Sequence, residues 1–107
     1  MADRTVLDEI AGERRRQIEA EGFDASHDDQ YPPGTLALAA AVYALPAAEG
    51  NSIHASGVRV WRALWPWDGS WLKRTTRRRD LIKAGALIVA EIERIDRAAQ
   101  EATDAEV

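Results

Sequence analysis

The apolar positions along the chain predict helices rather than strands. No segment alternates convincingly between apolar and polar residues at a period of two, which is the pattern of a half-buried strand. Helical signals instead mark three segments, at residues 5–21, 33–45 and 76–99. We therefore expect an all-α fold, a small bundle of three main helices.

The first two predicted helices have clear ends. Thr5 is a suitable N-cap for the first, and Gly22 follows it where a left-handed residue commonly ends a helix. A loop is expected over residues 23–33. The second helix carries no charge on any face, and Pro46 is expected to end it. Because a helix that is apolar all round is normally buried, we expect this one at the centre.

The last helix has the strongest pattern. Its apolar residues recur at heptad-like spacing and predict one buried stripe. These residues are Leu81, Gly85, Ile88, Ile92 and Ile95. The chain after Ala99 is small and acidic, so we expect it to fray.

Residues 46–75 are the least regular part of the chain. They contain all four tryptophans, which are Trp61, Trp65, Trp67 and Trp71. A short helix is expected over residues 58–65, followed by a turn over residues 66–71. At 107 residues, the whole chain (1–107) is expected to form a single domain.

Composition narrows the class of protein. The chain has no cysteine, which excludes disulfides, thiolate metal sites and a cysteine nucleophile. Acidic residues stand near the N-terminus where a signal peptide needs an apolar stretch. The longest apolar run, residues 36–48, is too short to span a bilayer. We expect a soluble protein of the bacterial cytoplasm with no membrane partner.

The charge distribution favours a small anionic ligand. The net charge of −4 argues against binding to duplex nucleic acid. One short stretch is nevertheless purely basic, with five cations and no acid between residues 73 and 79. These cations are Lys73, Arg74, Arg77, Arg78 and Arg79.

Aromatic rings lie beside this basic stretch. Trp67 and Trp71 can stack on a base while Arg77 and Arg78 attract its phosphate, which is the combination that a nucleotide requires. The alternative is that the tryptophans close one end of a three-helix core. The sequence leaves both interpretations open.

Two polar rows on the predicted helices are further candidates. On the first helix, four polar residues recur at spacings of three and four and therefore lie on a single face. This face could bind a polar ligand or a metal, or it could be an exposed surface with ion pairs between its side chains. The four residues are Glu13, Arg16, Gln17 and Glu21. The last helix carries a second row, either a ligand-facing groove or an internal ion-pair network. That row is Asp80, Lys83, Leu87 and Glu91.

Several common catalytic motifs do not occur in the sequence. It lacks the phosphate-binding loop of P-loop ATPases and the glycine pattern of Rossmann enzymes. It also lacks the zinc-binding motif of zincins and the nucleophile elbow of α/β-hydrolases. These four enzyme classes are therefore excluded.

Parts of the sequence resemble a family of short phage and prophage proteins. The resemblance extends from about Val6 to Arg97. The segments that carry it are Glu13-Arg-Arg-Arg-Gln-Ile-Glu-Ala-Glu-Gly-Phe23, His27-Asp-Asp-Gln30, Leu36 to Tyr43, Trp65-Pro-Trp-Asp68 and Arg79 to Arg97. This resemblance implies a phage origin and brings little function with it.

More loosely, the layout is similar to that of the all-α nucleotide pyrophosphohydrolases of the MazG type. Those enzymes hold magnesium with a Glu-Glu-x-x-Glu element and a later Glu-x-x-Asp. Glu93-Arg-Ile-Asp96 matches the second element in spacing. The first element has no counterpart, because the predicted second helix carries no acid.

Our leading hypothesis is a phage-type, nucleotide-binding protein that captures its ligand without cleaving it. Sequestering a host nucleotide signal is one use of such a protein, and we expect a homo-oligomer. The residues expected at the ligand are Glu13, Gln17, Trp67, Trp71, Arg77, Arg78, Lys83 and Glu91.

Two alternatives remain. One is a magnesium-dependent, MazG-like pyrophosphohydrolase in which Asp28, Glu91 and Asp96 hold the metal. His27, Asp28 and Asp29 could bind a divalent cation, but three adjacent polar residues are more typical of a turn. The other is a protein-interaction module in which the tryptophan segment is the main point of contact.

Overall fold

The computed structural model describes residues 4–47 and 64–106. Within these residues all regular structure is helical, which confirms the predicted all-α fold. The elements are α1 (Val6–Glu21), α2 (Ala25–Asp28), α3 (Thr35–Ala47), the 3₁₀ turn η2 (Gly69–Trp71) and α5 (Arg77–Ala105).

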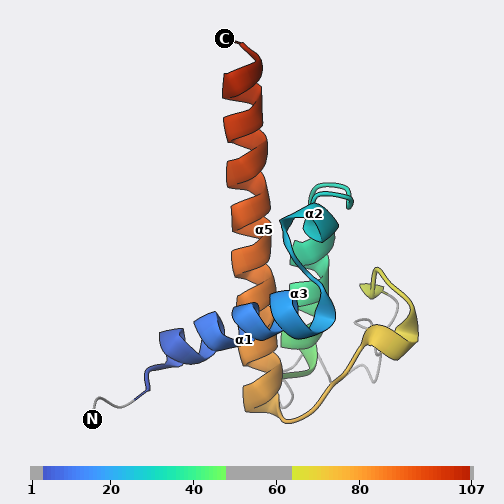
Figure 1. Ribbon diagram of the computed structural model, residues 1–107. Coiled ribbons are helices and arrows are strands. Elements are labelled where there is room, and N and C mark those ends of the chain that lie inside the picture. Colours follow the sequence, from blue (N-terminus) through green and yellow to red (C-terminus); the bar gives the residue numbers. More distant parts are fainter. Residues whose placement is uncertain (1–3, 48–63, 107) are drawn as a thin grey trace.

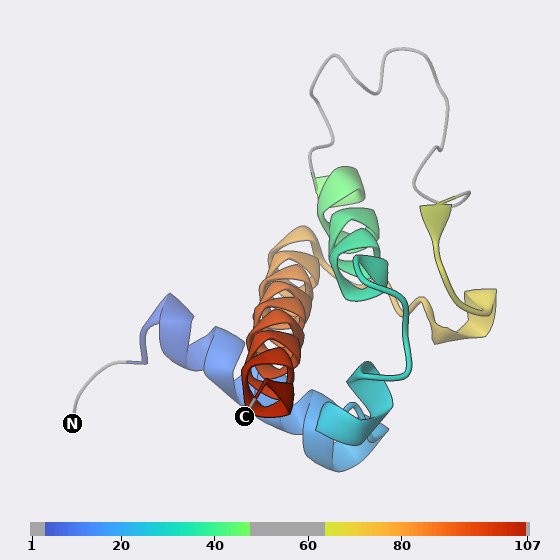
Figure 2. The same ribbon diagram turned by 90° about the horizontal axis from the view of Figure 1, so that it is seen from above.

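The long helix α5 is the element against which the others pack. α3 lies beside its first half and runs in the opposite direction, while α1 crosses α5 (Figures 1 and 2). The short α2 contacts α5 farther along. Beyond these contacts the C-terminal part of α5 extends away from the other helices (Figure 1), and every described residue after Arg97 is exposed.

Side-chain caps fix where the helices begin and end. The Thr5 hydroxyl accepts a hydrogen bond from the Asp8 amide, and the Asp8 carboxylate accepts one from the Thr5 amide. Gly22 has a φ of 76° and ends α1 as predicted. Thr76 caps α5 in the same way, with its hydroxyl accepting from the Arg79 amide.

The expected loop over residues 23–33 is wrong in part, because it contains the single-turn helix α2. Its N-cap is Asp24, whose carboxylate accepts a hydrogen bond from the His27 amide at 2.9 Å. An aspartate such as Asp24 can cap a helical turn but is equally typical of loops, so the sequence did not distinguish a loop from a short helix.

The segment before α5 is described from residue 64 onward. Asp68 accepts hydrogen bonds from the Ser70 amide and hydroxyl and begins η2, which confirms the turn predicted there. The Trp65 indole donates to the Asp68 carbonyl at 2.9 Å. The helix predicted over residues 58–65 falls almost entirely outside the described residues, as does Trp61.

The core between α3 and α5 is built largely from small side chains. Alanines on both helices allow the two backbones to approach closely. The buried cluster is Leu36, Ala39, Ala40, Tyr43, Ala84, Leu87 and Ala90. α3 is not buried all round, however, because Ala37, Leu38 and Ala41 are exposed. Pro46 also fails to end α3, which continues to Ala47.

The predicted buried stripe of α5 is wrong for this chain. Its four large members, which we call the α5 stripe, are each about half exposed. They are Leu81 (50%), Ile88 (50%), Ile92 (53%) and Ile95 (51%). α1 lies against this face of α5 at Gly85, where a Cβ atom would lie 3.0 Å from Ile10 Cδ1. The opposite face of α5 packs against α3 instead.

The C-terminal end of α5 differs from the prediction. α5 continues to Ala105, so the acidic segment expected to fray after Ala99 is helical. Among the described residues, no helix combines the length and apolar character that a membrane span requires.

Candidate functional site

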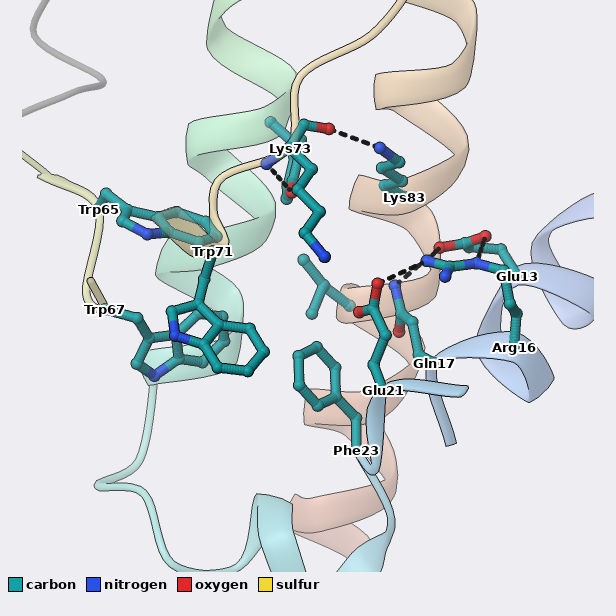
Figure 3. A pocket seen from close by; sticks show the side chains of 12 residues that line it. Glu13, Arg16, Gln17, Glu21, Phe23, Trp65, Trp67, Trp71, Lys73 and Lys83 are labelled. Carbon is teal, nitrogen blue, oxygen red and sulfur yellow. Dashed lines mark hydrogen bonds and ion pairs between the residues drawn. The ribbon is translucent and has the colours of Figure 1, made fainter. Parts of the chain in front are cut away.

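A pocket lies between α1, α3, α5 and the tryptophan segment (Figure 3). One side is polar and charged, and it is formed by Glu13, Arg16, Gln17, Glu21, Lys73 and Lys83. The other side is apolar and mostly aromatic, and it is formed by Phe23, Tyr43, Trp65, Trp67, Trp71 and Leu87. The pocket therefore has the two surfaces that a ligand with a ring and a charged group needs.

An arginine joins the two carboxylates on the polar side. Helical spacing places Glu13, Arg16 and Glu21 on one side of α1, and the Arg16 guanidinium donates to both carboxylates at 2.8 to 3.0 Å. Burial raises the pKa of Glu13, but the hydrogen bonds and charge of Arg16 and the charge of Arg79 outweigh it. The net effect is a lowered pKa, so this buried carboxylate is ionised at neutral pH.

Two buried polar atoms of the pocket have no hydrogen-bond partner among the described residues. One is Oε1 of Gln17, a residue only 3% exposed. Its Nε2 is 3.4 Å from a Glu13 oxygen, which leaves the carbonyl oxygen unused. The other is the indole Nε1 of Trp67. Because an unmade buried hydrogen bond costs about 1–3 kcal/mol, an acceptor and a donor here await a polar partner.

The two lysines of the polar side are held differently. Lys83, on α5, is buried and donates to the Lys73 carbonyl at 2.6 Å. Burial lowers its pKa, and its ammonium nitrogen lies 5.6 Å from the centre of the Tyr43 ring. The Lys73 amide in turn donates to the Tyr43 hydroxyl at 3.0 Å. These contacts fix the backbone at Lys73, whose side chain points into the pocket (Figure 3).

Aromatic rings form a continuous wall. Tyr43 and Trp65 meet edge to face at 5.6 Å, and Trp65 meets Trp67 in the same way at 5.2 Å. Trp67 then approaches Phe23 at 6.1 Å. Trp71 differs, because it is 53% exposed and makes no ring contact with another described aromatic residue. Its indole face is therefore accessible for stacking.

The wall continues into a second, wider cavity. That cavity has a volume of about 450 Å³, whereas the inner pocket leaves only about 30 Å³ free. Four side chains line both spaces, so they adjoin. These are Glu21, Phe23, Trp67 and Trp71. Because ligand pockets typically measure about 300–1,000 Å³, the outer cavity is large enough for a ring system. The inner pocket leaves room for about one water-sized group.

A hydrogen-bonded relay supports the floor of the outer cavity. The Tyr31 hydroxyl is 3.1 Å from His27 Nε2, and His27 Nδ1 is 2.9 Å from the buried Asp28. Arg14 completes the relay with a 3.0 Å bond to Asp28 and a 2.9 Å bond to the Phe23 carbonyl. The aromatic rings here are therefore fixed by buried charge as well as by packing.

The structure brings together five of the eight residues predicted at the ligand. These five residues come from distant parts of the sequence: the polar row of the first helix, the tryptophan segment and the row of the last helix. They are Glu13, Gln17, Trp67, Trp71 and Lys83. The two alternatives for the tryptophans do not exclude each other, because Trp65 and Trp67 pack against the core and also line the pocket.

The other three predicted residues lie elsewhere. Neither Arg77 nor Arg78 lines the pocket, and Arg78 instead pairs with Glu9 at 2.8 Å. Glu91 accepts from Arg94 at 2.6 Å and from the Gly34 amide at 2.9 Å. The row on the last helix is thus divided: Lys83 faces the pocket, and Glu91 takes part in internal bonds that fasten α3 to α5.

The metal set of the hydrolase alternative is not assembled. Asp28 is fully buried and bonded to Arg14, whereas Asp96 is exposed. Glu91 is bonded to Arg94. Across residues 4–47 and 64–106, no group of three or more His, Asp or Glu side chains is arranged to hold a metal ion. Arginines occupy the positions at which a cation would bind Asp28 and Glu91.

Several pocket residues were not among those predicted. Arg16 and Glu21 belong to the polar row of α1, and Lys73 belongs to the basic stretch, so the sequence carried a signal for each. Phe23 and Tyr43 carried none, because an isolated aromatic residue is as typical of a core as of a pocket.

No family model matches the chain, and neither a curated protein nor a solved structure matches it. What the pocket does must therefore follow from its own geometry and chemistry.

Proposed function

We propose that this protein captures a nucleotide, or a closely related molecule with a planar ring and an anionic group, and holds it without cleaving it. One observation carries the proposal. An accessible indole face, an unpaired buried acceptor and donor, and a lysine directed inward all meet in one pocket. From the resemblance to short phage proteins, we further propose that this capture serves to sequester a nucleotide signal.

The aromatic cavity is the proposed site for the base. A base lying in the outer cavity can stack on Trp71, and one such stacking contact is worth about 1–3 kcal/mol. The Trp67 indole N–H can then donate to a base acceptor, and Gln17 Oε1 can accept from an exocyclic amine. Both unpaired atoms would gain a partner in the complex.

The polar end is the proposed site for phosphate. Its three cations (Arg16, Lys73 and Lys83) outnumber its two carboxylates (Glu13 and Glu21), which gives a formal excess of one positive charge. Glu13 and Glu21 are already bonded to Arg16, so their repulsion of an anion is reduced. Lys73 is the cation best placed to meet phosphate, because no ion pair joins its ammonium group to a described residue.

Capture is favoured over hydrolysis by the state of the pocket carboxylates. Magnesium-assisted cleavage requires carboxylates that can hold the metal against the phosphate chain. Here both Glu13 and Glu21 accept hydrogen bonds from Arg16, and Glu13 is also paired with Arg79. A metal would have to displace two arginines that already neutralise these groups.

The test is to dialyse the purified protein against a pool of nucleoside triphosphates, NAD-derived species and cyclic nucleotides. The protein would then be denatured and its contents identified, with magnesium and again with EDTA. We expect an intact nucleotide from the protein fraction under both conditions. Accumulation of monophosphate and pyrophosphate only with magnesium would show hydrolysis instead. A pool that came through untouched would favour the protein-interaction alternative.

Variants locate the site. We expect Lys73→Met to weaken binding at least tenfold, because a charge-assisted hydrogen bond is worth about 1.5–3 kcal/mol. Trp71→Ala should have a similar effect through lost stacking. Arg15→Met is the matched control, since Arg15 is an exposed cation outside the pocket, and it should change affinity less than twofold. Equal losses in all three variants would contradict the proposed site.

A further inference from the structure

The outer cavity is walled mainly by aromatic rings. Five of the seven described side chains that line it are aromatic, namely Phe23, His27, Tyr31, Trp67 and Trp71. The Phe23 and His27 rings are stacked with their centres 4.7 Å apart, whereas the Tyr31 ring is inclined by 74° to His27 and by 50° to Trp67. The rings therefore surround one space of about 450 Å³ in several orientations, which is typical of an aromatic cage.

The other two residues that line the outer cavity are acids, Glu21 and Asp68. Asp68 Oδ1 accepts hydrogen bonds from the amide and the hydroxyl of Ser70, and these bonds lower the pKa of Asp68. Both donors are uncharged, so they keep the carboxylate ionised without cancelling its charge. Within the described part of the chain, no lysine or arginine lines this cavity. The outer cavity is therefore negative, whereas the inner pocket carries an excess of cations.

This combination selects for positive charge. The face of an aromatic ring is negative, so it attracts a cation and repels an anion. A carboxylate at the same cavity acts in the same direction. A neutral ring could stack on Trp71 but would gain nothing from the charge of Glu21 or Asp68, and a phosphate group would be repelled. A cation is the group that all the walls of this cavity favour.

We propose that the outer cavity binds a positively charged organic group, a cationic heteroaromatic ring or a quaternary ammonium, so that the captured molecule carries a cation together with its phosphate. Only the phosphate part of this inference rests on the proposed function. Four side chains line both spaces, so one molecule can extend across them. Its cation then lies beside Trp67 and Trp71, and its phosphate points toward Lys73.

The first test uses cations that carry no phosphate, each beside a neutral molecule of the same shape. One pair is 1-methylnicotinamide and 3-methylbenzamide, and the other is choline and 3,3-dimethylbutanol. The indole N–H signals of Trp67 and Trp71 are followed by nuclear magnetic resonance during each titration. We expect a cation to bind at least about tenfold more tightly than its neutral partner, and the pair that shows this distinguishes a ring from an ammonium group. Undetectable binding of both cations, or no preference in either pair, would overturn the proposal.

The second test removes one charge from the cavity. Asp68→Asn keeps the shape of the side chain and an oxygen for the Ser70 bonds. We expect it to weaken binding of the preferred cation at least about threefold, because a unit charge a few ångströms away attracts a cation even through water. Binding of the neutral partner should not change. Glu19→Gln is the matched control, since Glu19 is an exposed carboxylate on α1 that lines neither space. Equal effects of the two variants would contradict the role of Asp68.

The third test separates this inference from the proposed function by comparing oxidised with reduced nicotinamide mononucleotide, which differ in the charge of the ring. We expect tighter binding of the oxidised form. Capture of nucleotides with no preference for a cation, in this pair or in the first test, would overturn the inference and leave the proposed function in place. Binding of a phosphate-free cation by a protein that retains no nucleotide would support the inference and contradict the proposed function.

Discussion

The two long faces of α5 differ in a way that reverses the usual relation between size and burial. The face packed against α3 carries small residues, such as Ala84 and Ala90, together with the buried charges Lys83 and Glu91. The α5 stripe carries four large aliphatic side chains and is half exposed. The chain thus covers its small and polar face and leaves its most apolar one open.

This difference follows from what each face has to do. Alanines let α3 approach closely enough for the Gly34 amide to reach Glu91 and for Tyr43 to meet the lysine-bearing segment. The buried charges are tolerated because each has a bonded partner. Leu87 is the large aliphatic residue of α5 in this core cluster, and it also lines the pocket.

The largest expected effect contrasts one substitution on the two faces. Leu87 is 3% exposed and Leu81 is 50% exposed, and both are leucines on α5. We expect Leu87→Ala to lower the free energy of unfolding by about 2–5 kcal/mol, because it leaves a cavity. Leu81→Ala should cost less than about 1 kcal/mol. Urea denaturation at low protein concentration measures both, and equal costs would contradict the assignment of the faces.

A smaller effect tests the contact between α1 and α5 at Gly85. A Cβ atom at Gly85 would lie 3.0 Å from Ile10, so Gly85→Leu forces α1 away from α5. We expect a loss of about 1–3 kcal/mol in the free energy of unfolding, as is usual for overpacking. Adding Ile10→Ala should restore part of that loss, whereas Ile10→Ala alone should only destabilise. Additive losses in the double variant would show that the two residues do not meet.

The smallest expected effect is a pH dependence of stability that comes from Glu91, on the face of α5 packed against α3. The pKa of Glu91 is lowered, chiefly by the hydrogen bond that its carboxylate accepts from Arg94. Burial acts in the opposite direction, and the hydrogen bond from the Gly34 amide lowers the pKa further. Its stabilising contribution is therefore complete above the ordinary glutamate pKa of 4.5 and is lost as pH falls through the lowered value.

Unfolding measured between pH 5 and 3 checks this. We expect the free energy of unfolding to fall with pH in the wild type and to fall less steeply in Glu91→Gln. Ile92→Gln, on the stripe, introduces no titratable group and should keep the wild-type slope. A slope that Glu91→Gln leaves unchanged would contradict the role given to this carboxylate.

The helices could be predicted because their signals are local. Thr5 and Gly22 act within one turn of the backbone, so the sequence shows them directly, and both were confirmed. The stripe was also identified correctly as a pattern. Its burial was not, because periodicity shows which side chains favour a covered position and does not show what covers them.

The candidate site was predictable only in part for a similar reason. Lys83 and Gln17 lie on helix faces that helical spacing defines, and both line the pocket. Arg77 and Arg78 were expected there because they follow the tryptophans closely. The bend before α5 instead directs Lys73 inward, while Arg78 pairs with Glu9. That outcome depends on contacts between distant segments, which no local pattern records.

The most direct measurement of the proposed capture is native mass spectrometry of the wild type and Lys73→Met in the nucleotide pool. We predict intact nucleotide bound to the wild type and much less bound to Lys73→Met, because Lys73 lines the pocket and supplies the cation proposed to meet phosphate. A wild-type protein that carries no nucleotide, or a Lys73→Met variant that retains as much as the wild type, would contradict the account.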